Sequence, residues 1–140
     1  MCDQIYIMDI ETGQSNLVST GHGVTTCAYF DYPACKNIIY SSTHLGSKDC
    51  PPKPDYRMGY VWKLYQDYDV FSSSIDGGSI VQLTDSKNYD AEATVAFDGS
   101  KIIYTSMSSG DLDIWTMNKD GSNKKQLTNQ LGYDGGAFFS

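Results

Sequence analysis

Acidic side chains stand beside tyrosines at two matched places in this sequence. Tyr89-Asp90-Ala91-Glu92 and Tyr133-Asp134-Gly135-Gly136 correspond, and Gly21-His22-Gly23 holds the same place in a more diverged copy. Carboxylates of this kind, with His22 beside them, could bind a hard cation such as Ca²⁺ or the basic side chain of a partner. The candidate metal ligands are Asp90, Glu92 and Asp134. The other interpretation, which we favour, is that Asp90 and Asp134 cap turns.

A second acidic position also recurs. Asp69 and Asp113 each precede a strand-like run, and Asp67 and Asp111 lie two residues earlier. Alternate residues of a strand point the same way, so each pair could share a cation. Turn capping explains the same residues without a ligand, and we favour that explanation.

These positions belong to a repeat. Asp76-Gly77, Gln82-Leu83-Thr84 and Tyr89-Asp90 each recur 44 residues later, as Asp120-Gly121, Gln126-Leu127-Thr128 and Tyr133-Asp134. This period is close to the roughly 40 to 45 residues of a four-stranded propeller blade. A third copy opens the chain, where the run from Gln4 to Gly13 matches the run from Asp69 to Gly78.

Short strands, rather than helices, must position these residues. The runs 5–10, 38–42, 102–106 and 113–117 are rich in Ile, Tyr, Trp and Thr. Tight turns that contain Gly separate strand-like runs at Glu11-Thr12-Gly13, Asp76-Gly77-Gly78 and Asp120-Gly121-Ser122. Apolar residues at helical spacing do not persist over three turns anywhere in the chain. The predicted fold class is all-β.

The segment AFDGSKIIYTSMSSGDLDIWTMNKDGSNKKQLT, from Ala96 to Thr128, resembles the TolB-type β-propeller repeat. The resemblance extends over nearly the whole chain and implies four-stranded antiparallel blades, with a periplasmic or secreted location. Repeat units are expected at about 1–43, 67–106 and 111–140, which makes an open arc of about three blades. The remaining blades would come from a longer chain, or a second copy would complete the ring as a homodimer.

An insert at 43–66 interrupts the second unit and contains three of the four prolines. Its aromatic side chains, Tyr60, Trp62 and Tyr65 among them, could form a recognition surface on the rim of the propeller or a cover for the blade. The relatives that this sequence resembles keep one Cys in the inner strand and another before the Pro-Pro pair. The resemblance therefore implies a Cys27–Cys50 disulfide in an oxidising compartment.

The composition disfavours two classes of partner and membrane insertion. Ten Lys and Arg against seventeen Asp and Glu give a net charge of −7, which disfavours nucleic acid and anionic membrane surfaces as partners. The longest apolar run is far below the ~20 residues that cross a bilayer, so membrane insertion is not expected.

We therefore expect a non-catalytic scaffold that binds a protein or peptide, without a cofactor unless Ca²⁺ binds. Its binding residues would be His22, Tyr89, Asp90, Glu92, Tyr133 and Asp134 at the channel mouth, together with the three aromatic residues of the insert. The alternative is a metal-dependent propeller lyase or hydrolase, or the propeller domain of a larger peptidase. An enzyme would need His22 or His44 to converge with Asp90 and Asp134 on one metal.

Overall fold

The computed structural model describes residues 2–57 and 59–140, and it is built from antiparallel strands. A two-stranded sheet of β1 (Tyr6–Met8) and β2 (Ser15–Leu17) comes first. The next sheet contains β3 (Thr25–Phe30), β4 (Asn37–Ser42), β5 (Asp69–Ser74) and β6 (Ile80–Gln82) in chain order. The last contains β7 (Asp90–Val95), β8 (Lys101–Ser106), β9 (Asp113–Asn118) and β10 (Lys125–Gln126), again in chain order.

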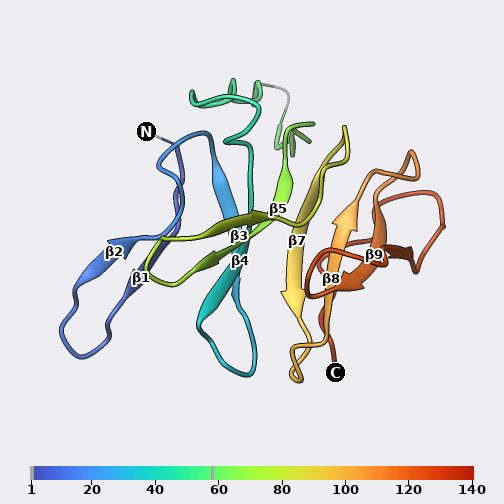
Figure 1. The fold of residues 1–140 in the computed structure, drawn as a ribbon. Helices are drawn as coiled ribbons and strands as arrows, with labels where there is room; N and C mark the ends of the chain where they lie inside the picture. Colours follow the sequence, from blue (N-terminus) through green and yellow to red (C-terminus); the bar gives the residue numbers. More distant parts are fainter. Residues whose placement is uncertain (1, 58) are drawn as a thin grey trace.

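The three sheets follow one another across the molecule as an open arc, with β1 and β2 at one end and β9 at the other (Figure 1). The two four-stranded sheets are complete blades, and β1 with β2 is the outer half of another. The predicted all-β propeller arc is therefore confirmed. None of the residues that the structure describes forms a helix able to cross a membrane.

Asp-Gly turns join consecutive strands, as predicted: Asp98-Gly99 lies between β7 and β8, and Asp120-Gly121 lies between β9 and β10. The Asp98 and Asp120 side chains each accept a hydrogen bond from the backbone N–H two residues on, at 2.9 and 3.0 Å. Gly121, with φ of +82°, lies so close to the preceding blade that a Cβ there would be 2.8 Å from the Leu83 carbonyl oxygen. Such a position requires glycine for both its backbone angle and its lack of a side chain.

The apolar core lies between neighbouring sheets. One cluster joins the two complete blades and contains Ile39, Val70, Leu83, Ala93, Val95, Ile102, Tyr104 and Met117. A smaller cluster of Val18, Ile38, Tyr40 and Phe71 joins the β1–β2 sheet to the next blade, with Ile5 and Ile7 packed against it. Each blade thus depends on its neighbour for burial, as in other repeat folds.

Candidate functional site

The inner strands of the arc share an unusual backbone feature. Cys27 in β3 and Glu92 in β7 have φ of +55° and +58°, and the strand register breaks around each of them. Gly136, the repeat equivalent of Glu92, has φ of +63°. The two register breaks, at Cys27 and Glu92, are β-bulges, which turn a side chain out of the ladder and are common next to functional sites.

Glu92 uses its bulged position to join three segments. Its carboxylate accepts hydrogen bonds from the Tyr133 hydroxyl at 2.8 Å, the Thr105 hydroxyl at 2.8 Å and the Gly136 backbone N–H at 2.8 Å. The segment after β10 is therefore held against β7, where the Thr94 hydroxyl also donates to the Ala137 carbonyl.

Tyr133 connects this carboxylate to the aromatic insert. The Trp62 and Tyr133 rings lie with their centroids 5.7 Å apart, a distance typical of aromatic pairs. Burial, with the Glu92 hydrogen bond and charge as further causes, raises the pKa of Tyr133 well above its ordinary value. The phenol therefore stays protonated and keeps donating to Glu92.

A second row of rings leads inward from the insert. Tyr65 packs on Tyr68 at 6.1 Å, and Tyr68 packs on Tyr89 at 5.7 Å. The Tyr65 hydroxyl donates to the Pro52 carbonyl at 2.8 Å, which ties two parts of the insert together. Burial raises the pKa of Tyr68 to about 12 and that of Tyr89 further still, so both remain neutral hydrogen-bonding groups.

A cavity of about 220 Å³ opens beside Glu92. It lies between β3, β7 and the segment after β10, and its lining consists of Cys27, Ala28, Tyr29, Glu92, Ala93, Thr94, Gly136 and Phe138. Glu92 is the one charged side chain in this lining. We call Trp62, Tyr133 and Glu92, with this cavity, the mouth site.

The other predicted channel residues do not all join the mouth site. Asp90 is only 1% exposed and faces Ser106 across the ladder, and burial raises the pKa of its carboxyl. The Asp134 backbone N–H donates to the Leu112 carbonyl, and its side chain is half-buried. His22 lies in an exposed turn and is close enough to His44 to help burial lower the pKa of that imidazole.

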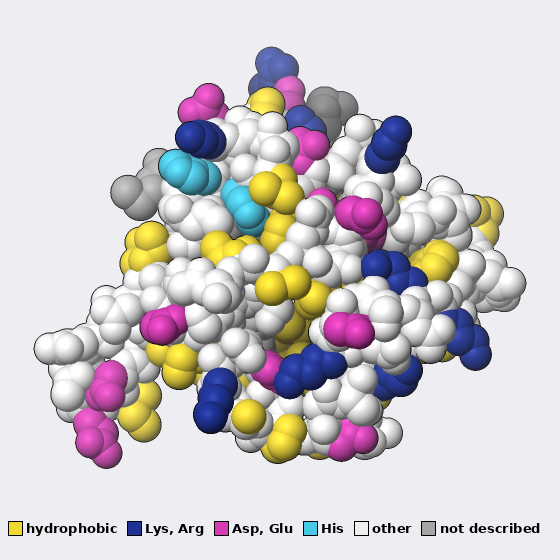
Figure 2. Space-filling model, viewed as in Figure 1, with side chains coloured by type: hydrophobic (Ala, Val, Ile, Leu, Met, Phe, Trp, Pro, Cys, Tyr) yellow, Lys and Arg dark blue, Asp and Glu magenta, His cyan; other side chains and the backbone are white. Residues whose placement is uncertain are grey.

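The two histidines lie next to each other on one face of the molecule, while the acidic side chains on that face are scattered (Figure 2). Across residues 2–57 and 59–140, no three His, Cys, Asp or Glu side chains come close enough together to hold a metal ion. Asp90, Glu92 and Asp134 are thus not gathered into one set of ligands.

The second acidic position has a structural role that the sequence reasoning did not define. Asp113 accepts hydrogen bonds from Gln126 at 2.8 Å and Thr128 at 3.3 Å, and Asp69 likewise accepts from Gln82 at 3.0 Å and Thr84 at 3.2 Å. The signal was present in the sequence, because the Asp and the Gln-Leu-Thr motif recur with the same 44-residue spacing.

The predicted Cys27–Cys50 disulfide is wrong. Cys50 pairs with Cys2, while Cys27 and Cys35 are free. Backbone hydrogen bonds from Thr25 to Asp3 and from Gly23 to Lys48 bring the N-terminal segment beside the insert. Cys27 instead lines the cavity at the bulge of β3, where it faces β7.

The insert presents most of its aromatic residues to solvent, as Tyr60 is 86% and Trp62 53% exposed, while Tyr65 is half-buried. The insert lies along one edge of the arc, above the inner strands (Figure 1). The three predicted rim residues therefore divide into two that remain available for contact and one that anchors the insert.

Comparison with known proteins shows the fold. A protein assigned as TolB from Agrobacterium tumefaciens matches with a TM-score of 0.69 and 21% identity, and TolB from Acinetobacter baumannii with 0.63 and 23%. An oligogalacturonate lyase in complex with manganese matches with a TM-score of 0.61 and 14% identity.

Each match covers 89% of this chain, but only 40%, 26% and 34%, respectively, of the matched protein. No family model matches the sequence. At these identities the likeness defines the architecture alone: the chain has the TolB-like β-propeller fold, as two complete blades flanked by parts of two others.

Proposed function

We propose that this chain is part of a non-catalytic propeller scaffold that binds a protein or peptide partner at the mouth site. The observation that carries the proposal is the contact between Trp62 of the insert and Tyr133, whose hydroxyl donates to Glu92. It joins an exposed aromatic surface to a carboxylate beside an open cavity. Aromatic residues are enriched where proteins recognise one another.

The partner surface has a basic side chain in this proposal. A Lys or Arg side chain can lie over the exposed rings of Trp62 and Tyr60 and be attracted by the Glu92 charge. The net charge of −7 favours the same partners at longer range.

The test is to select peptides from a random displayed library on the folded chain and to measure their affinity for variants. Trp62→Ala should weaken binding at least tenfold, because the ring supplies contact area. Glu92→Gln should weaken the binding of basic peptides and reduce the salt dependence of that binding. Phe97→Ala, which removes an exposed ring on the β7–β8 turn, is the matched control. Equal losses in Trp62→Ala and Phe97→Ala would contradict the proposal.

A metal-dependent lyase or hydrolase is the second candidate, supported by the likeness in fold to the manganese-bound lyase. Against this candidate, no three His, Cys, Asp or Glu side chains of the described residues lie close enough together to hold a metal ion. Elemental analysis of the purified chain for Mn, Zn and Ca tests both this candidate and a Ca²⁺ site at Asp90, Glu92 and Asp134. Stoichiometric metal, together with turnover that Asp134→Asn abolishes, would establish the enzyme in place of the scaffold.

We further propose a periplasmic or extracellular location, in which a disulfide persists. The Cys2–Cys50 disulfide supports an oxidising compartment. Labelling of thiols on protein isolated from its native source should modify Cys27 and Cys35 and spare Cys2 and Cys50. Four reactive thiols would contradict this location.

A further inference from the structure

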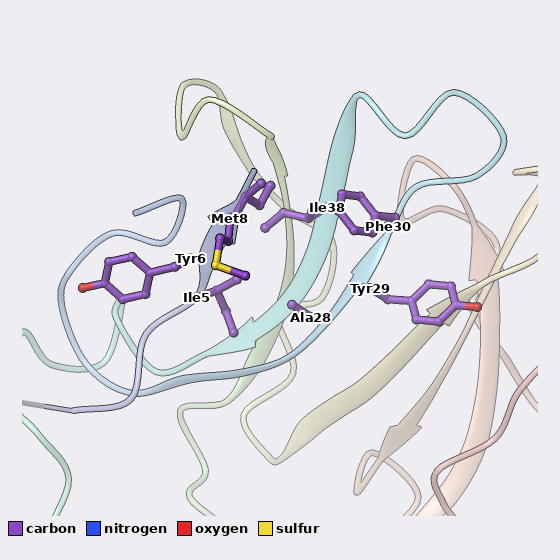
Figure 3. Close-up of a pocket in the computed structure, with 8 residues that line it drawn as sticks. Ile5, Tyr6, Met8, Ala28, Tyr29, Phe30 and Ile38 are labelled. Carbon is purple, nitrogen blue, oxygen red and sulfur yellow. The ribbon is translucent and has the colours of Figure 1, made fainter. Parts of the chain in front are cut away.

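An apolar groove lies between β1 and the sheet of β3 and β4, and it shares Ala28 and Tyr29 of β3 with the lining of the mouth-site cavity. It has a volume of about 210 Å³ and is lined by Ile5, Tyr6, Ile7, Met8, Ala28, Tyr29, Phe30 and Ile38. No lining residue is charged, and Ile5, Ile7 and Ile38 also belong to the core behind it. Figure 3 shows β1 on one side of the groove and β3 with β4 on the other, with the rings of Tyr6 and Tyr29 pointing away on opposite sides.

The chain contains a template for what fills such a groove. β1 is the repeat equivalent of β5 and β9, because the N–H groups of Val18, Leu83 and Leu127 donate to the carbonyls of Ile5, Val70 and Ile114, respectively. At the interface between the two complete blades, Val70 therefore has the position that Ile5 has beside the groove. There the space beside Val70 is filled by Ile39 of β4, the strand that pairs with β5.

The edge of β1 is also unpaired where that strand would lie. β5 pairs with β4 on one side and β6 on the other, and β9 pairs with β8 and β10. Among the residues that the structure describes, β1 pairs only with β2. The Ile5 carbonyl and the Asp9 N–H bond toward β2. Because backbone groups alternate between the two sides of a strand, the N–H and C=O groups of Tyr6 and Met8 point to the free edge.

The groove and the free edge of β1 together indicate which kind of ligand would bind there. We propose that β1 binds an extended strand of a partner polypeptide, antiparallel to it, that places an aliphatic side chain in the groove. β4 and β8 indicate which side chains the bound strand should have, because both contain the sequence Ile-Ile-Tyr. The second Ile of this sequence pairs with Ser72 in β5 and with Thr116 in β9, and these two residues are the repeat equivalents of Ile7 in β1. The aliphatic side chain that enters the groove is uncharged in both strands, which suits a lining without charge. Main-chain hydrogen bonds supply affinity and the groove supplies selectivity, as in other strand-addition complexes.

The groove shares Ala28 and Tyr29 with the mouth-site cavity, but the variants that test it lie at residues outside the mouth site, so the two proposals can fail independently. The probe is a fluorescent synthetic peptide that copies residues 100–107, SKIIYTSM, which includes β8. Binding should be saturable by fluorescence anisotropy. A peptide with Ile103→Asp, or one N-methylated at alternate residues, should bind at least tenfold more weakly.

Two measurements locate the peptide. Phe30→Glu, at the rim of the groove, should weaken binding at least tenfold, while Leu131→Glu, an equally apolar and fully exposed position elsewhere, should not. Hydrogen exchange resolved by residue should slow at least tenfold at the Tyr6 and Met8 amides and stay unchanged at Ile7. This alternation is independent of any effect of Phe30→Glu on folding.

The proposal is overturned if the peptide does not bind, if N-methylation has no effect, or if protection appears elsewhere. A dimer would also overturn it. If the chain without peptide has a mass of 31 kDa, twice 15.5 kDa, and its Tyr6 and Met8 amides are already protected from exchange, a second copy occupies the β1 edge.

Discussion

At the scale of single residues, Asp69 carries a partly buried carboxyl that forms no ion pair with a side chain of residues 2–57 or 59–140. Burial, and secondly the Asp90 charge, raises the pKa of Asp69 from its ordinary value of 3.8 to about 6, although the Thr84 and Gln82 hydrogen bonds oppose this. The folded state therefore binds the proton more tightly than the unfolded state. Stability contributed by this group is full below about pH 4 and is lost as pH rises through about 6.

We predict that Asp69→Asn removes this loss. Between pH 4 and pH 7 the variant should gain about 1 to 2 kcal/mol relative to the original chain, a value reduced for the partial exposure of the side chain. Urea unfolding at the two pH values measures the difference. Asp76→Asn is the control, because Asp76 lies in an exposed turn where hydrogen bonds lower the pKa of its carboxyl. This variant should still lose stability between pH 4 and 6, as the original chain does. An unchanged pH dependence in Asp69→Asn would contradict the assignment.

The same residue shows what the sequence could reveal. The 44-residue spacing identified Asp69 and Asp113 as repeated, and their favoured explanation as structural residues agrees with the hydrogen bonds they accept. The choice of partner did not follow from spacing, because the Gln and Thr residues come from a neighbouring strand end whose register depends on the turn. The Glu92 contacts were likewise out of reach, since a bulge displaces the side chain from strand alternation.

At the scale of elements, one threonine closes the outer hairpin of each complete blade. Thr84 accepts a hydrogen bond from the Val70 N–H at 2.8 Å and donates to Asp69, and Thr128 does the same for Ile114 and Asp113. Thr84 is 1% exposed, whereas Thr128 is half-buried. Water can replace the lost hydroxyl only at the second position.

We therefore predict that Thr84→Val costs about 1 to 3 kcal/mol of unfolding free energy, the range for leaving a buried polar group unpaired. Thr128→Val, the same change in the same motif, should cost less than half as much. Chemical unfolding of both variants decides the comparison. Equal losses would show that solvent access is not what separates the two sites.

The insert is an element held by its disulfide. Cys2–Cys50 closes a loop with a sequence separation of 48 residues, so Cys50→Ser should lower stability by up to about 4 kcal/mol on the chain-entropy estimate. Trypsin should also cut the variant faster after Arg57 and Lys63, because the insert loses its anchor. Cys27→Ser, which removes a free thiol, should change neither result. Slow cleavage in Cys50→Ser would mean that aromatic packing alone holds the insert.

The insert also separates what sequence patterns predict from what they do not. Prolines and tyrosines marked the insert as an aromatic segment, and Tyr60 and Trp62 are exposed in the structure. The cysteine partner was wrong because four cysteines allow three pairings, and nothing local states which segment runs beside which. Only the hydrogen bonds from Thr25 to Asp3 and from Gly23 to Lys48 decide it.

At the scale of the whole molecule, repeat arithmetic predicted the arc because each blade is nearly self-similar. The repeat does not predict what covers the first and last sheets of the arc, because the neighbouring blade on that side is not part of this sequence. The segment after β10 has the place of a first strand, while β1 and β2 have the places of third and fourth strands. Joining two copies end to end therefore leaves the second-strand place unfilled at each junction.

We predict that the chain is a monomer of 15.5 kDa at low concentration and that its mean mass rises steadily with concentration, without a plateau at twice that value. Contacts at an unpaired strand edge do not close into a ring unless the geometry repeats, so they produce open series of copies. Light scattering after size exclusion measures this, and EDTA should not change it. Met8→Lys, which puts a charge beside the free edge of β1, should suppress the rise, whereas Tyr60→Lys on the insert should not. A stable 31 kDa species would contradict this prediction, and its resistance to Met8→Lys would place the interface of that dimer away from the β1 edge.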